Sequence, residues 1–202
     1  MPDLSQYVYD PRSRRYRNIS NGQFVTAKTV RAAVDAVISA ETVKVRDIAQ
    51  RLIDGSINLA EWQIQTTSLL KTLYVAVGIA ACGGFENTSN ADLGYLGSLI
   101  KKQYEFLRNF ANDIKQGRQA LDGTLLARAE LYTQAARGIY SAMVTRAAKM
   151  GGMTEAKRLL GPADHCSTCL SQAAKGWQNI DNVLPIGDAE CLSNCRCDLV
   201  FR

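Results

Sequence analysis

The chain has 202 residues, of which 47% are apolar and 21% are charged. This length and composition suit one packed domain, or one domain with a small appended module, and argue against extended disorder. The formal net charge of +5 is compatible with nucleic-acid contact but is well short of a histone-like protein. We expect no secretory signal, since the first ten residues lack a basic region followed by an apolar run. The longest apolar stretch, residues 73–85, is too short to span a bilayer.

Residues 1–25 are predicted to form an extended basic arm, because they show no helical periodicity. Four arginines lie around Tyr16 in this arm: Arg12, Arg14, Arg15 and Arg17. Basic side chains interleaved with an aromatic ring can lie along phosphates. The alternative interpretation is a solvated, flexible tail.

Apolar residues at 3.6-residue spacing predict a helical bundle over residues 26–162. The long helices are expected at about 26–54, from 58 to the glycine pair at 83–84, at about 92–115 and at about 124–150. Thr26 is a candidate cap of the first helix, and Asn58 with Glu61 forms a variant of the capping box at the second. Short connections indicate antiparallel neighbours. A short fifth helix is expected over residues 155–160.

After residue 162 the periodicity disappears, and residues 163–202 are predicted to form an irregular, cysteine-rich module. This module holds five of the six cysteines: Cys166, Cys169, Cys191, Cys195 and Cys197. In a reducing compartment, clustered cysteines bind metal more often than they form disulfides. The cysteines at 166–169 and those at 191–197 can each form a tight turn, called a knuckle, that brings sulfurs onto one metal ion. Two such knuckles far apart in the chain can complete a tetrahedral site, and zinc is the default ion for thiolate ligands. About 40 residues cannot build a large core, so we expect one structural zinc ion per chain.

The ligand set stays open at this point, because five cysteines and His165 exceed four ligands. The first three cysteines are favoured, together with either Cys195 or Cys197, since residues two apart on a strand face opposite ways. His165 adjoins Cys166 and is too close to share the same ion comfortably. Disulfides formed late, an iron–sulfur cluster and unliganded thiols are the alternatives. Four thiolates on one Zn²⁺ would lower the formal charge from +5 to +3.

No catalytic residues are expected. The sequence has no Walker loop, dinucleotide fingerprint, serine elbow or histidine pair, and it contains a single histidine. A catalytic zinc would keep an open position beside a general acid or base. Asp164 and Asp188 lie near the cysteines, but aspartate is a common loop residue.

The cysteine tail carries a family resemblance. The segment LGPADHCSTC at 160–169, the pairs at 176–177 and 184–185, Gly187, and CLSNCRC at 191–197 are similar to the tail of phage head morphogenesis proteins. These include the Mu F-like minor head proteins. Upstream segments at 15–17, 22–25, 59–63, 103–110 and 128–132 also resemble phage or prophage homologues. Many Mu F-like members carry a histidine shortly before the closing Cys-Arg-Cys, and here Cys191 stands near that place, one residue further back.

The resemblance implies a structural virion component that is present in few copies and is made in the host cytoplasm. Its expected partners are portal or head–tail connector proteins, with packaged DNA and further copies of the chain as additional contacts. A zinc-stapled nucleic-acid-binding protein is the alternative function, based on the basic arm and the cysteine knuckles.

Overall fold

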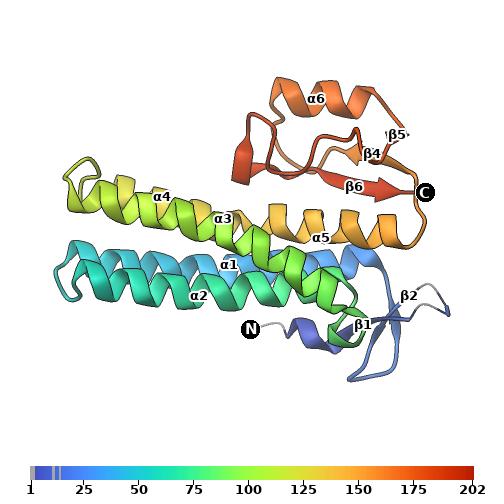
Figure 1. Cartoon of the computed structure of the whole chain (residues 1–202), viewed down its shortest axis with the longest axis horizontal. Coiled ribbons are helices and arrows are strands. Elements are labelled where there is room, and N and C mark those ends of the chain that lie inside the picture. The colour runs from blue at the N-terminus through green and yellow to red at the C-terminus, as the bar shows by residue number, and fades with distance from the viewer. Residues whose placement is uncertain (1–2, 11, 14) are drawn as a thin grey trace.

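A computed structural model describes residues 3–10, 12–13 and 15–202, and it shows a mainly helical protein with a cysteine cluster near the C-terminus (Figure 1). The helices are α1 (Ala27–Ile53), α2 (Leu59–Ala81), α3 (Asn90–Lys115), α4 (Gly123–Gln134), α5 (Ala136–Met150) and α6 (Ser167–Ala174). The strands are β1 (Tyr7–Asp10), β2 (Arg15–Asn18), β3 (Phe24–Val25), β4 (Glu155–Leu159), β5 (Gln178–Asn179) and β6 (Asp198–Phe201). Short 3-10 turns are η1 (Leu4–Gln6), η2 (Phe85–Asn87) and η3 (Leu192–Asn194).

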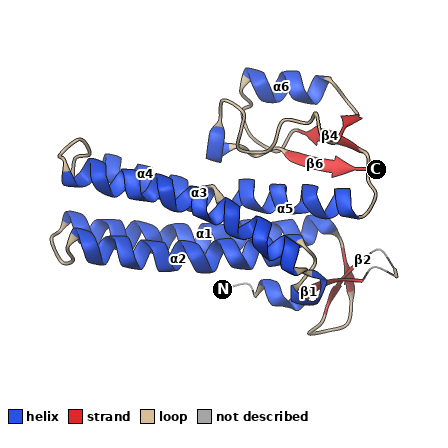
Figure 2. Cartoon of the chain, viewed as in Figure 1, coloured by secondary structure: helices blue, strands red, loops and turns tan. Residues whose placement is uncertain are grey.

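Helices α1 to α5 pack lengthwise around one apolar core (Figure 2). Side-chain caps set where four of these helices begin, and at α4 the cap is Asp122, which accepts the backbone N–H of Thr124. Thr26 accepts the backbone N–H of Thr29, and Asn58 and Glu61 form the predicted capping box at α2. A second capping box, which was not predicted, joins Ser89 and Asp92 at α3. These caps satisfy amide groups that have no partner within the helix.

The centre of the bundle is aromatic. The Trp62 ring meets the edge of Phe110 at 5.2 Å between centroids, and Phe110 stacks on Tyr132 at 5.7 Å. The buried hydroxyl of Tyr74 donates to the carbonyl of Tyr132 at 2.7 Å. Helix α2 is long and apolar enough, by length and composition only, to cross a membrane. A core helix of a bundle meets the same criterion, and α2 packs against α1, α3 and α5.

The long helix expected over residues 124–150 is two helices, α4 and α5, separated at Ala135. The ψ angle of Ala135 is −19°, which is typical of a 3-10 turn rather than an α-helix. Just before it, the buried Thr133 hydroxyl donates to the carbonyl of Glu130 and lies 2.7 Å from the hydroxyl oxygen of Thr42 on α1. Local bonding of a threonine hydroxyl to the helix backbone often bends helices.

The described residues of the N-terminal arm form a small antiparallel sheet with the strand order β1-β2-β3. This sheet is attached to the end of α2. The backbone N–H of Tyr9 donates to the carbonyl of Gly83 at 2.8 Å, and Asn87 Nδ2 donates to the carbonyl of Tyr9 at 2.8 Å. A Cβ on Gly83 would lie 2.4 Å from the Cβ of Tyr9, and its φ of +86° also favours glycine. The described part of the arm is therefore folded against the bundle and is not a free tail.

Residues 155–160 were expected to be helical, and this expectation is wrong. Residues 155–159 form β4, the central strand of a sheet with the order β5-β4-β6. Ala156 and Arg158 point into the module and are buried. The sheet, α6 and the cysteines surround a second, smaller core that starts at Ala156, before the expected module boundary at residue 163. The module is thus more regular than predicted.

The module lies directly on α5 and α1. A Cβ on Gly138 of α5 would be 3.2 Å from the carbonyl oxygen of Ile186, and Gly187, with a φ of +101°, approaches the same glycine. Arg31 of α1 forms an ion pair with Asp198 at the start of β6. Close backbone approach and this ion pair hold the module against the bundle.

Candidate metal centre

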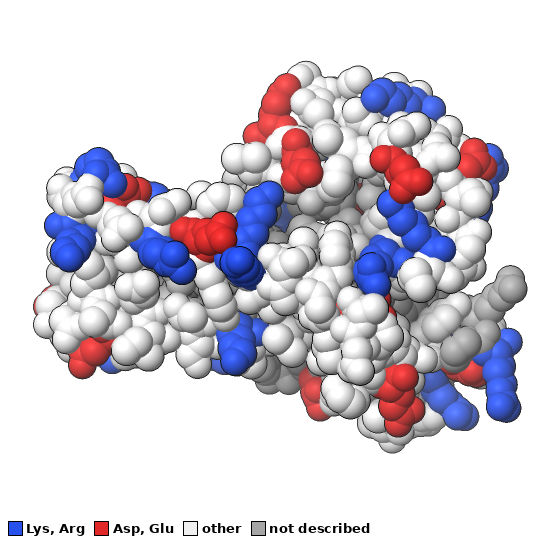
Figure 3. Space-filling model, viewed as in Figure 1, with Lys and Arg blue, Asp and Glu red and all other residues white. Residues whose placement is uncertain are grey.

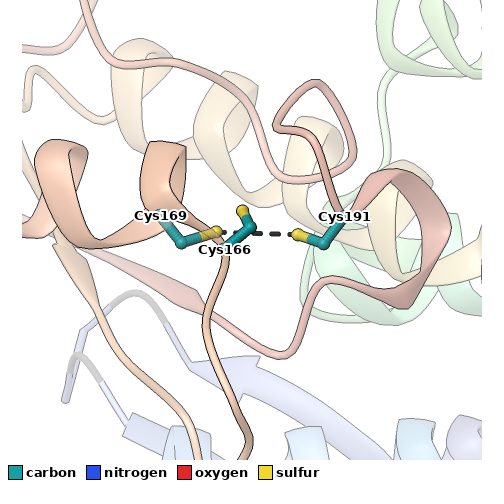
Figure 4. A group of neighbouring side chains, drawn as sticks. All are labelled: Cys166, Cys169 and Cys191. Atoms are coloured by element: carbon teal, nitrogen blue, oxygen red, sulfur yellow. Dashed lines mark hydrogen bonds between the residues drawn. The ribbon is translucent and has the colours of Figure 1, made fainter.

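Five cysteines converge in the module from two parts of the chain. Cys166 is the N-terminal cap of α6, and Cys169 lies in its first turn. Cys191 and Cys195 flank the turn η3, and Cys197 directly precedes β6. Figure 4 shows the side chains of Cys166 and Cys169 extending from the start of α6 toward Cys191, which comes from the facing loop.

The sulfur atoms form two overlapping groups that share Cys169. The Sγ atoms of Cys166, Cys169 and Cys191 all lie within 4.8 Å of one another, as do those of Cys169, Cys195 and Cys197. The Sγ of Cys169 is 3.6 Å from that of Cys191 and 3.8 Å from that of Cys195. Sulfurs at the corners of a tetrahedron around zinc, with Zn–S bonds of about 2.3 Å, lie about 3.8 Å apart. The cluster can therefore hold a metal ion.

Backbone amides favour the thiolate form of one cysteine on each side of the cluster. The backbone amide of Cys169 stabilises the Cys166 thiolate and lowers the pKa of Cys166 to about 7. Burial raises the pKa of Cys195, but hydrogen bonds from the N–H of Cys197 and from neighbouring thiols outweigh burial and lower it. Burial raises the pKa of Cys169, and it raises the pKa of Cys191 to about 11. The thiolate is the form of cysteine that binds metal.

Cys195 and Cys197 do not face opposite ways. Their sulfurs both lie near Cys169, because the two residues precede β6 and Cys195 has φ −59° and ψ 127°, close to polyproline II backbone rather than a strand. His165 turns toward Cys197, with its Nδ1 atom 3.7 Å from the Cys197 Sγ. The Nε2 atom of His165 lies 2.8 Å from the carbonyl oxygen of Gly161. The structure thus pairs His165 with Cys197.

Arg158 is the residue of this site that the sequence analysis missed. It lies on β4, is 1% exposed, and its Nη1 atom is 3.7 Å from the sulfurs of both Cys169 and Cys195. Its Nη2 atom donates to the carbonyl oxygens of Leu184 at 2.6 Å and Pro185 at 3.3 Å. The one signal in the sequence was the alternation of buried and less buried positions along β4. Because one of the buried positions holds a charged residue, Arg158, the alternation was not recognised.

The remaining candidate residues lie elsewhere. Asp164 and Asp188 are exposed, and neither belongs to the two sulfur groups. None of the six cysteines, all in the described part of the chain, is in a disulfide. The Sγ atoms of Cys169 and Cys191, for example, are 3.6 Å apart, far more than an S–S bond of about 2.05 Å. Arg12, Arg15 and Arg17 are exposed at the other sheet, and Arg14 lies outside the described residues.

Comparisons with family models, with curated proteins and with solved structures found no match for this chain.

Gly161 supplies a direct test of how the cysteine module closes. A Cβ at this position would lie 2.0 Å from the carbonyl oxygen of Arg196, between Cys195 and Cys197. We expect Gly161→Ala to push the closing Cys-Arg-Cys segment away and to lower the free energy of unfolding by about 1–3 kcal/mol. Denaturant unfolding and limited proteolysis of the module measure this effect. Gly97→Ala is the matched control, because a Cβ there meets no atom within 4 Å. Equal stability of both variants would contradict the close contact.

Proposed function

We propose that this chain is a structural virion protein of a tailed phage, a minor head protein that acts near the portal or the head–tail junction. The observation that carries the proposal is the cysteine tail, whose Cys-x2-Cys and Cys-Arg-Cys pattern resembles the phage head morphogenesis family. Support comes from the gathering of these cysteines in one module that packs on a helical bundle. The role is structural, with host cytoplasm as the site of synthesis and assembly.

The proposal includes one structural zinc ion held by four thiolates. Cys166, Cys169 and Cys191 form one close group, and Cys195 completes the set because its sulfur lies 3.8 Å from that of Cys169, the spacing expected around zinc. Hydrogen bonds lower the pKa of Cys195, so its thiolate is favoured. Cys197 instead faces His165. A thiolate-rich site favours zinc over magnesium or calcium.

Elemental analysis tests the zinc centre. We expect protein purified without chelator to carry about one zinc ion per chain, since a structural site takes four ligands. Cys195→Ser should lose the ion, and its module should become sensitive to protease. Cys197→Ser is the matched control, two residues away, and should keep the ion. Zinc loss from Cys197→Ser alone would reverse the assignment of the fourth ligand, and metal-free wild-type protein would contradict the centre.

An exposed apolar groove is the surface that best fits a head or portal partner. It lies between α3, α4 and the module and has a volume of about 750 Å³ (Figure 3). Phe106 is 46% exposed, Leu131 41% and Leu192 62%, and all three line the groove. Large apolar side chains gathered at one surface mark an interaction site more often than scattered ones do.

Co-expression with the portal protein of the same phage tests the proposed partner. We expect the two proteins to co-purify, and Leu131→Asp to weaken the association at least tenfold, because a charge in an apolar contact is left without a partner. Ile64→Asp is the control, since Ile64 is 69% exposed on α2 and does not line the groove. If the wild-type chain never associates with portal or head proteins, the proposed role is wrong.

A zinc-stapled nucleic-acid-binding protein is the second candidate, favoured by the face of the N-terminal sheet. Arg15 and Arg17 are exposed on the same side of β2, and their guanidinium carbons lie 4.5 Å and 5.8 Å from the centroid of the Phe24 ring. Exposed arginines beside an aromatic ring can contact phosphates and bases.

Salt dependence separates this candidate from the first. If the sheet binds DNA, the logarithm of the association constant should fall steeply with the logarithm of salt concentration. The double variant Arg15→Ser/Arg17→Ser should reduce that slope by about 2, one for each lost phosphate contact. Titration of labelled duplex and single-stranded DNA measures it. No binding at low salt would remove this function.

A further inference from the structure

Arg158 is a buried cation in a module that offers it no carboxylate. The side chain is 1% exposed, its two Nη atoms contact two backbone carbonyls and the sulfurs of Cys169 and Cys195, and its buried Nε has no hydrogen-bond partner among the described residues. In the described part of the chain, no aspartate or glutamate forms an ion pair with it. Arginine stays protonated in proteins, so the positive charge is carried into the core of the module. An unpaired buried charge strongly destabilises a folded state, which means that a counter-charge is required.

Among the residues that the structure describes, the groups in contact with Arg158 that can supply negative charge are the two cysteine sulfurs. Protonated thiols are neutral and would leave the guanidinium uncompensated. Four thiolates around Zn²⁺ carry a net charge of −2, with part of that charge on the two sulfurs that Arg158 approaches at 3.7 Å. Hydrogen bonds from outside the ligand set orient metal ligands and tune the site.

We propose that Arg158 is the counter-cation of the metal centre, a positioning residue that makes the module specific for the metal-bound, thiolate form of the cluster. The inference rests on the proposed zinc centre and extends it to a residue outside the ligand set. The Nη1 atom of Arg158 joins one cysteine of the first knuckle to one of the second, and its Nη2 atom donates to the carbonyl oxygens of Leu184 and Pro185. Metal binding and closure of that loop are thereby coupled through one side chain.

A purely structural role for Arg158 makes a different prediction. If the side chain only donated hydrogen bonds from β4 to the loop carbonyls, a neutral donor could replace it. The affinity for zinc would then not depend on the charge of residue 158. If the charge compensates the thiolates, a lysine should preserve more of the zinc affinity than a glutamine does. Lys157 is a matched control site, since it is the neighbouring residue of β4 and lies on the opposite side of the strand.

The test is a zinc titration of the full chain in competition with a chromophoric chelator. We expect Arg158→Gln to weaken zinc binding by about 10- to 100-fold, the usual effect of removing an outer partner of a metal site. Arg158→Lys should bind more tightly than Arg158→Gln, and Lys157→Gln should match the wild type. Denaturant unfolding of the metal-free proteins is the second readout, and metal-free Arg158→Gln should be no less stable than metal-free wild type.

Three results would overturn the proposal. Equal zinc affinity of Arg158→Gln and wild type would show that the charge is not coupled to the metal. Equal weakening by glutamine and lysine, together with lower stability of the metal-free proteins, would assign Arg158 to the loop alone. Wild-type protein that binds no zinc would remove the zinc centre itself, an outcome distinct from the first two, in which the wild type does bind the ion.

Discussion

The C-terminal module depends on the meeting of four chain segments at the guanidinium of Arg158. The segments are β4, the start of α6, the loop at Leu184 and Pro185, and the stretch from Cys191 to Cys197. The apolar core beneath them consists of few and mostly small side chains, such as Ala156, Ala189 and Val183. Burial of so little apolar surface contributes too little free energy to offset the entropy of ordering the chain. The cysteine cluster lies where a bound metal ion, as proposed above, would join these segments.

The helical bundle has no such requirement. Its core is continuous and large, with Trp62, Phe110 and Tyr74 fully buried. With the proposed metal ion bound, the two parts would differ in what unfolds them. Loss of packed volume would unfold the bundle, and loss of the metal ion would unfold the module. The bundle and the module contact each other at Gly138 and Gly187, where backbone packs against backbone. This close contact fixes the position of the module on α5.

The long helices α1, α2 and α3 were predictable because the signals that define them are local, whereas α6 and the division of α4 from α5 were not predicted. Periodicity, the cap at Thr26 and the capping box at Asn58 depend on residues within one or two turns. The cysteine cluster was predictable for another reason, since only a few roles explain five clustered cysteines. Zinc itself and the phage role remain proposals. The break at Ala135 depends on the meeting of Thr133 with Thr42 from a distant helix, which no local pattern reveals.

The strand β4 and the residue Arg158 were missed for a linked reason. An alternating strand is recognised by apolar residues at every second position, and here one of those positions holds an arginine. Its burial is explained only when the sulfurs of Cys169 and Cys195, which are 11 and 37 residues away along the chain, lie beside it. The N-terminal sheet was missed because its strands are short and its anchor, Gly83, lies outside the arm.

The attachments between parts of the molecule are concentrated at one end of the bundle. The N-terminal sheet joins the end of α2 at Gly83, and the module lies along α5, whereas the α1–α2 and α3–α4 connections at the opposite end are free of both (Figure 1). Local opening of a protein is easiest where the fewest contacts must break. Amide hydrogen exchange should therefore follow a gradient along the helices, fastest near Gly55 and Gly117 and slowest toward the anchored end. The end of the bundle that carries the α1–α2 and α3–α4 connections would therefore open more easily than the end that carries the N-terminal sheet.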